Sequence, residues 1–224
     1  MKHRAGQAKQ RLGSVIIFLA WAPERSPAPF PLRHAGLRHD RPLTQAQRVA
    51  AELLRTQGPK HQRLRLRHRR RPRLRSATGR RYAVSITHSD GLVLVAWASG
   101  FGIRLGVDCE RDRRNPKARL AQRLPWEEGR GPYGKLTGNW TALEAALKAD
   151  GRGLSGLGRL GATANPWRLT RSPPGVGTVR LAPVNRGPAG FVLTLALRRD
   201  GPRSPCGSEA SPPAGPDRAQ RSYG

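Results

Sequence analysis

Apolar residues are gathered in short runs of strand length, and this feature constrains the fold of the chain most. Val15 to Ala20 is a β-branched run that Pro23 closes, and Leu92 to Trp97 is a second continuous apolar run. Runs of this length that end at turn residues predict strands buried on both faces. None of them approaches the ~20 residues that cross a bilayer, so a membrane-spanning helix is not expected. An export signal is the alternative for the first run, since Lys2 and Arg4 precede it.

Helical spacing appears at two places. Val49, Leu53 and Leu54 follow the candidate N-cap Thr44 at intervals of a helix. The second helix is expected over residues 139–149, with Asn139 as its N-cap and Gly151 as its end. The remaining apolar runs predict strands over 82–86, 103–110, 176–182 and 191–197, with a polar break at 87–91.

The order of these segments predicts an α+β fold made of two similar halves. Residues 91–97 and 190–196 resemble each other, which suggests one half over 14–102 and another over 103–200. We expect a basic N-terminal tail over 1–13. Residues 201–224 are Gly, Pro, Ser and Arg with almost nothing to bury, so we expect a disordered tail there.

The chain carries 42 Lys and Arg against 14 Asp and Glu, a formal net charge of +28. Such a surplus points to an anionic partner: nucleic acid, an anionic membrane surface, a phosphorylated ligand or an acidic protein. Only six of the cations are lysines, so a compositional bias toward arginine is an alternative source of the charge. Cys109 and Cys206 are too few for a disulfide framework or a zinc site, and we expect a reducing, cytoplasmic compartment.

The first candidate site is Gly-Val-Asp-Cys-Glu at 106–110. Residues two apart on a strand share a face, so Asp108 and Glu110 would present two carboxylates while Cys109 packs behind them. Paired carboxylates together with substrate phosphates are a common way to hold Mg²⁺. Surface acids that meet neighbouring arginines are the alternative.

The second candidate is the helix at 139–149. Trp140, Glu144 and Lys148 follow one another at i, i+4 spacing and would form one stripe. The alternative is structural, because Thr141 and Glu144 fit a capping box and Glu144 and Lys148 an ordinary ion pair. A third candidate is the turn expected at Thr87, His88 and Ser89, whose hydroxyls and imidazole suit a phosphate.

The order of these pieces resembles a known family. Arg71 before Pro72, Ser-Ile-Thr-His-Ser at 85–89, Gly-Val-Asp-Cys-Glu at 106–110 and Trp-Thr-x-x-Glu-Ala-x-x-Lys from 140 are similar to the motifs of 4′-phosphopantetheinyl transferases of the surfactin-synthetase-activating (Sfp) type. The resemblance covers about residues 43–200. It implies two pseudo-symmetric subdomains, each a small antiparallel sheet packed on a long helix, with nucleotide contacts in 14–102 and the catalytic residues in 103–200.

The resemblance also implies a reaction. Such enzymes move the 4′-phosphopantetheine group of coenzyme A (CoA) onto a serine of an acyl or peptidyl carrier domain and release adenosine 3′,5′-bisphosphate. By matching motif, Asp108, Glu110 and Glu144 would hold Mg²⁺. Glu144 would also remove the serine proton, and Lys148 would neutralise the pyrophosphate.

By the same matching of motifs, the resemblance implies that Thr87, His88 and Ser89 bind the nucleotide phosphates. Arg71 matches the basic residue of the family's G-K/R-P motif, and Arg48 or Arg55 on the first helix would meet the 3′-phosphate. The expected partners are CoA and acidic carrier domains, and the expected state is a monomer.

Two alternatives stay open at this point. The segment 60–81, with eleven cations and no acid, would serve a nucleic-acid-binding protein as a basic arm. Departures from the family pattern at Arg70, Ser85 and Leu143 would fit an inactive relative of the transferases.

Overall fold

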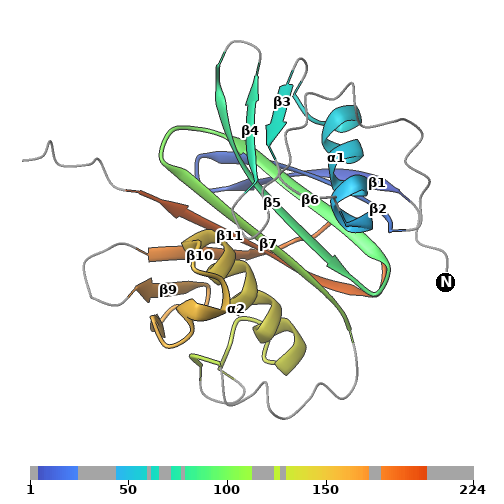
Figure 1. The fold of residues 1–224 in the computed structure, drawn as a ribbon. Coiled ribbons are helices and arrows are strands. Elements are labelled where there is room, and N and C mark those ends of the chain that lie inside the picture. The colour runs from blue at the N-terminus through green and yellow to red at the C-terminus, as the bar shows by residue number, and fades with distance from the viewer. Residues whose placement is uncertain are drawn as a thin grey trace, which may run out of the picture.

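A computed structural model describes residues 5–24, 44–59, 62–65, 72–76, 79–112, 124–126, 130–171 and 178–200. Within them the chain forms two antiparallel sheets and two α-helices, an α+β architecture as expected (Figure 1). Arg71, residues 60–61, 66–71 and 77–78 of the basic segment, and the expected tail over 201–224 lie outside the described residues. Among the described helices, none has the length and apolar character of a membrane span.

The first sheet has the order β1-β2-β6-β5-β4-β3 and carries helix α1 (Gln45–Gln57) on one face. The helix starts where expected, because the Thr44 hydroxyl accepts from the Gln47 N–H and the Gln47 side chain accepts from the Thr44 N–H. The strands of this sheet are β1 (Gly6–Leu12), β2 (Val15–Pro23), β3 (Gln62–Arg65), β4 (Arg73–Ser76), β5 (Arg81–Ser89) and β6 (Leu92–Ser99).

The second sheet has the order β7-β11-β10-β9-β8 and carries helix α2 (Leu136–Asp150). A short 3₁₀-helix, η3 (Gly153–Gly156), follows α2. The strands are β7 (Ile103–Arg111), β8 (Leu160–Ala162), β9 (Arg168–Arg171), β10 (Thr178–Pro183) and β11 (Phe191–Arg199). The expected boundary between residues 102 and 103 falls in the turn between β6 and β7.

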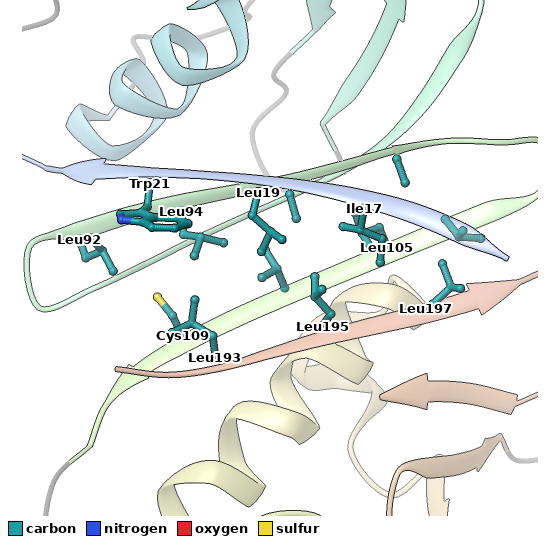
Figure 2. Packing of buried hydrophobic residues seen from close by; sticks show 14 residues of the cluster. Ile17, Leu19, Trp21, Leu92, Leu94, Leu105, Cys109, Leu193, Leu195 and Leu197 are labelled. Atoms are coloured by element: carbon teal, nitrogen blue, oxygen red, sulfur yellow. The ribbon is translucent and has the colours of Figure 1, made fainter. Parts of the chain in front are cut away.

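The two sheets pack face to face between the helices, which gives the layers α1, first sheet, second sheet and α2 (Figure 1). Figure 2 shows the apolar layer between the sheets, where side chains of β2 and β6 meet those of β7 and β11. On β6, alternate residues face this layer and α1, so every residue from Leu92 to Ala98 is buried. This explains why β6 is a continuous apolar run.

Three local expectations differ from the structure. Residues 6–12, expected within a basic tail, form β1 and pair with β2. Strand β5 runs on to Ser89 and turns back through Asp90 and Gly91, both at positive φ, so the polar break is a two-residue hairpin turn. Helix α2 begins at Leu136, because Asn139 does not cap it and instead accepts a bond from the Tyr133 N–H at 3.0 Å.

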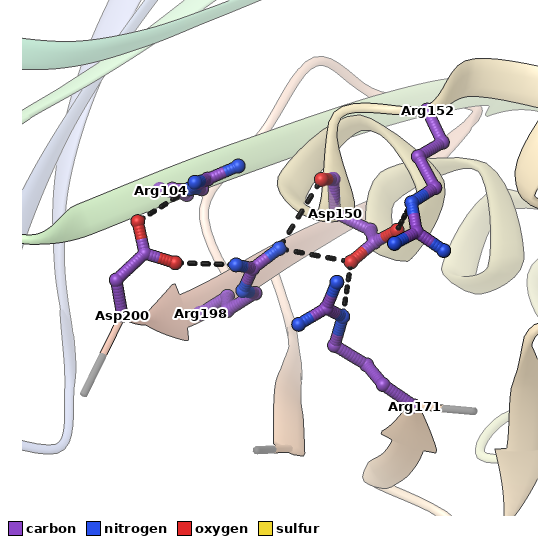
Figure 3. A network of polar contacts seen from close by, with 6 residues as sticks. All are labelled: Arg104, Asp150, Arg152, Arg171, Arg198 and Asp200. Atoms are coloured by element: carbon purple, nitrogen blue, oxygen red, sulfur yellow. Dashed lines mark hydrogen bonds and ion pairs between the residues drawn. The ribbon is translucent and has the colours of Figure 1, made fainter. Parts of the chain in front are cut away.

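An arginine network fixes the end of α2 (Figure 3). Buried Asp150 accepts from Arg198 Nη1 at 2.9 Å and pairs with Arg171 Nε at 2.5 Å, while Arg152 Nε lies 3.5 Å away. An acidic residue at the carboxyl end of a helix opposes the helix dipole, and the arginine charges offset this. The network thereby ties α2 to β9 and β11.

Gly106 on β7 permits the close approach of α2. A Cβ atom there would lie 1.9 Å from the Ala145 carbonyl oxygen and 2.7 Å from the Ala149 nitrogen, both backbone atoms of α2. The strand and the helix therefore lie too close together for any side chain at this position.

We predict that Gly106→Ala lowers the free energy of unfolding by about 3 kcal/mol, because the helix backbone must move to admit the methyl group. Urea denaturation followed by circular dichroism measures the loss. Gly161→Ala is the matched control, since its Cβ would meet only the Thr170 hydroxyl at 3.2 Å. Equal losses in the two variants would contradict this account of the packing.

Candidate functional site

Strand β7 lies at the edge of the second sheet and has different chemistry on its two faces. Val107 and Cys109 point into the apolar layer between the sheets. Gly106, Asp108 and Glu110 alternate with them and face the side on which α2 packs. The expected arrangement of two carboxylates with the cysteine behind them is therefore present.

Helix α2 brings a third carboxylate to the same place. One oxygen each from Asp108, Glu110 and Glu144 lies within 4.8 Å of the others. Thr141, which a capping box would place at the helix start, lies inside the helix, and its hydroxyl donates to the Thr137 carbonyl at 2.9 Å. The capping-box alternative is thus wrong, and Glu144 is available to the carboxylate cluster.

Lys148, one turn further along α2, is the cation of the cluster. Its Nζ donates to Asp108 Oδ1 at 2.6 Å and to the Val107 carbonyl at 3.1 Å. The Asp108 side chain is 2% exposed and that of Lys148 is 32% exposed, so the pair lies at the boundary between the interior and solvent. The other Asp108 oxygen, Oδ2, is buried and has no hydrogen-bond partner.

Strand β5 of the first sheet lays a row of hydroxyls against β7. Thr87 donates to Asp108 Oδ1 at 2.8 Å, and Ser89 donates to Glu110 Oε2 at 2.9 Å. Ser85 accepts from the Val107 N–H at 3.0 Å. Thr87 and Ser89, which were expected in a turn, lie on β5, and both hydroxyls bond the carboxylates.

Burial perturbs two ionisable groups here. Burial, and next the negative charge of Asp108, raise the pKa of Glu144 from 4.5 to about 7, although Lys148 acts in the opposite direction. Burial also raises the pKa of the Cys109 thiol to about 12, with a further contribution from Asp108. Glu144 therefore exchanges a proton near neutral pH, whereas Cys109 stays a thiol.

The other expected site residues are not in contact with the cluster. His88 is exposed, and it points to the α1 side of the first sheet because Val84 and Ile86, which alternate with it, pack against α1. Arg48 is exposed on α1, and Arg55 pairs with Glu52 at 2.6 Å.

Tyr133 is a residue near the cluster that the sequence analysis missed. Its hydroxyl lies 2.8 Å from Thr194 Oγ1 and donates to the Leu193 carbonyl at 2.8 Å. Thr194 is the register partner of Asp108, so Tyr133 fixes the strand beside the carboxylates. Burial raises the pKa of Tyr133 to about 12. No spacing in the sequence links a loop tyrosine to β11.

The donor set suits a hard divalent cation. Three carboxylates converge, one buried oxygen lacks a partner, and the neighbouring thiol faces away. Oxygen ligands of this kind are those that Mg²⁺ prefers. No protein-family model and no curated protein matches the chain, so the geometry of these residues carries the functional argument.

We predict that, without divalent ions, the folded state loses stability between about pH 4.5 and pH 7 through Glu144. A raised pKa means that the folded chain keeps a proton that the unfolded chain releases, so the contribution is complete below pH 4.5 and is lost as the pH rises through 7. Its size is roughly 1 to 3 kcal/mol. Urea denaturation in EDTA at several pH values should show a flatter profile for Glu144→Gln than for the wild type.

Glu52→Gln on α1 is the control for that series, because it removes a carboxylate far from the cluster. The interpretation fails if Glu144→Gln and the wild type show the same pH slope.

We predict that the hydroxyls of β5 support metal binding. Thr87→Val and Ser89→Ala should each weaken binding of Mn²⁺, a probe for Mg²⁺, about 10-fold, because outer groups orient the ligating carboxylates. Titration calorimetry measures the affinity. Thr87→Ser, which keeps the hydroxyl, should bind Mn²⁺ as tightly as the wild type does. Thr170→Val on β9 should leave the affinity unchanged. Wild-type Mn²⁺ affinity in both Thr87→Val and Ser89→Ala would show that these hydroxyls do not support metal binding.

Proposed function

We propose that the chain is a 4′-phosphopantetheinyl transferase of the surfactin-synthetase-activating type, which transfers 4′-phosphopantetheine from CoA to a serine of an acyl or peptidyl carrier domain. One observation carries the proposal. Asp108, Glu110, Glu144 and Lys148, which the motif resemblance selects from two separate segments, meet in one cluster in the structure. This meeting of two separate motifs supports the proposal.

The order of elements supports the pseudo-symmetric fold that the proposal requires. The series β2, α1, β3, β4, β5, β6 builds a sheet of order β2-β6-β5-β4-β3, to which β1 adds an edge. The series β7, α2, β8, β9, β10, β11 builds the order β7-β11-β10-β9-β8. The similar segments 91–97 and 190–196 fall at equivalent places, the turn before and most of β6 and β11.

In this proposal Asp108, Glu110 and Glu144 hold Mg²⁺ against the CoA pyrophosphate. A bound Mg²⁺ ion would neutralise charge on the phosphate oxygens and polarise the reacting phosphorus. Lys148 contributes positive charge at the same place. Its Nζ has three N–H groups, and the structure uses two of them on Asp108 and Val107, which leaves one for a phosphate oxygen.

The carrier serine supplies the nucleophile. Its oxygen forms a bond to the phosphorus that bears the pantetheine arm, and the bond from that phosphorus to the bridging oxygen breaks. The electron pair leaves with adenosine 3′,5′-bisphosphate, whose new phosphate oxygen Lys148 stabilises. The serine proton passes to a carboxylate oxygen of Glu144, which acts as the general base beside the metal.

Other residues would bind the nucleotide end of CoA. His88, Arg48 and Arg71 are its assigned contacts, whereas Thr87 and Ser89 bond the carboxylates in the structure. The net charge of +28 favours acidic carrier domains as partners, since opposite charge speeds encounter and orients the complex. We propose a monomeric, cytoplasmic enzyme.

We predict Mg²⁺-dependent transfer by the purified protein. Incubation with CoA, Mg²⁺ and a panel of apo carrier domains should add one phosphopantetheine to the carrier serine by mass spectrometry. Glu144→Gln should lower the rate at least 100-fold while leaving CoA binding partly intact, because a general base contributes about 10² to 10⁴. Arg71→Ala should mainly weaken CoA binding. Lys135→Ala, at the start of α2, is the control and should retain the wild-type rate.

Other outcomes identify the alternatives. Binding of Mg²⁺ and CoA without transfer to any carrier, where a control enzyme succeeds, would indicate an inactive relative. Salt-sensitive binding to nucleic acid that survives Asp108→Ala, with no CoA binding, would indicate the nucleic-acid-binding protein.

A further inference from the structure

The exposed apolar side chains of the molecule gather at one place. Ile16, Phe18 and Phe101 are the large hydrophobic residues that are exposed in the described part of the chain, at 44%, 38% and 102%. All three line one hollow of about 830 Å³. Contiguous exposed apolar surface of this kind usually marks an interaction site.

The hollow lies far from the carboxylate cluster. It is bordered by the β1–β2 turn, the β6–β7 turn and the end of β11, which lie together at the left of Figure 1. Ile103 at its edge begins β7, and Glu110 lies seven residues further along the same strand, roughly 24 Å away at ~3.4 Å per residue. The hollow is therefore a separate site.

Two of the apolar side chains occupy sheet surface that neither described α-helix covers. Helix α1 packs over Ala20 and Ala22 of β2, and it leaves Ile16 and Phe18 of the same face open. Phe18 stacks on buried Trp97, with ring centres 5.8 Å apart. This stack orders the Phe18 ring at the side of the hollow.

Phe101 stands on a fixed turn. The Gly102 carbonyl accepts from the Asp200 N–H at 2.8 Å, and the Asp200 carboxylate binds Arg104 Nε at 2.6 Å and also Arg198 (Figure 3). The turn is thus tied to the end of β11, which fixes the backbone that presents the exposed Phe101 side chain.

The rim of the hollow is positive. Lys9 Nζ lies 5.7 Å from the centre of the Phe18 ring, exposed Arg11 is the register partner of Ile16, and exposed Arg199 lines the hollow. No ion pair among the described residues includes these three cations. Asp200, the acid that lines the hollow, is already bound by Arg104 and Arg198.

We infer that this hollow binds an acidic segment of a partner protein, which places one or two large apolar side chains beside Phe18 and Phe101 and its carboxylates against Lys9, Arg11 and Arg199. Charge complementarity selects the occupant. A second copy of a chain with net charge +28 would be repelled. A membrane is disfavoured because Ile16 and Phe18 line a concave surface, which suits an inserted side chain better than a flat bilayer.

The test uses the full chain and a fluorescein-labelled peptide of alternating Glu and Phe residues. Fluorescence anisotropy should show micromolar binding that Phe101→Ser and Arg199→Ser each weaken at least 10-fold. Phe101 is fully exposed, so its replacement leaves the fold intact. Arg168→Ser on β9 removes the same charge elsewhere and should change the affinity less than twofold. A peptide of alternating Glu and Ser should bind weakly and equally to all variants.

Four results would overturn the inference. The first is equal peptide binding by the wild type and Phe101→Ser. The second is binding to phosphatidylserine vesicles, but not to the peptide, that depends on Phe101. The third is a Phe101-dependent dimer in analytical ultracentrifugation. The fourth is competition by a synthetic peptide of residues 201–224, which would assign the hollow to the chain itself.

Discussion

The open edge of β7 is the constraint around which the molecule is organised. An edge strand exposes backbone N–H and C=O groups that must be satisfied when buried. At Val107 the N–H group bonds the Ser85 hydroxyl and the carbonyl accepts from Lys148, so one partner comes from the first sheet and the other from α2. Asp108 is held from the same two sides, by Thr87 of the first sheet and by Lys148 of α2. The groups that complete the strand edge are thus also those that position the carboxylates.

Charge is distributed unevenly along α2. Near its middle, Glu144 joins two carboxylates of β7 with Lys148 as their cation. Six residues after Glu144, Asp150 is surrounded by three arginines. The arginine network neutralises its acid and anchors the helix, whereas the carboxylate cluster retains an excess of negative charge. Burial, and next that excess, raise the pKa of Glu144, since a proton on Glu144 reduces the negative charge of the cluster.

Local patterns predicted the parts of the site that one element builds alone. The two-residue period of β7 placed Asp108 and Glu110 together, and the helical period of α2 placed Glu144 beside Lys148. The contact of Thr87 and Ser89 with β7 could not be derived in this way, since it depends on how two sheets cross. The hydroxyls at 85, 87 and 89 do alternate, which would have suggested one strand face. The predicted start of α2 was wrong because the Asn139 side chain bonds the N–H of Tyr133 in the preceding loop and does not cap the helix.

The placement of Cys109 decides which ligand atoms the proposed metal site offers. A thiolate is a soft ligand that attracts zinc and copper, whereas carboxylates suit magnesium and calcium. Cys109 stands between two carboxylates in the sequence, yet its sulfur lies in the apolar layer of Figure 2. In the proposed metal site, the pleat of β7 therefore presents oxygen ligands and keeps the sulfur away from them. A slip of one residue in the pairing with β11 would bring Cys109 to the side of α2 and turn Asp108 and Glu110 into the apolar layer.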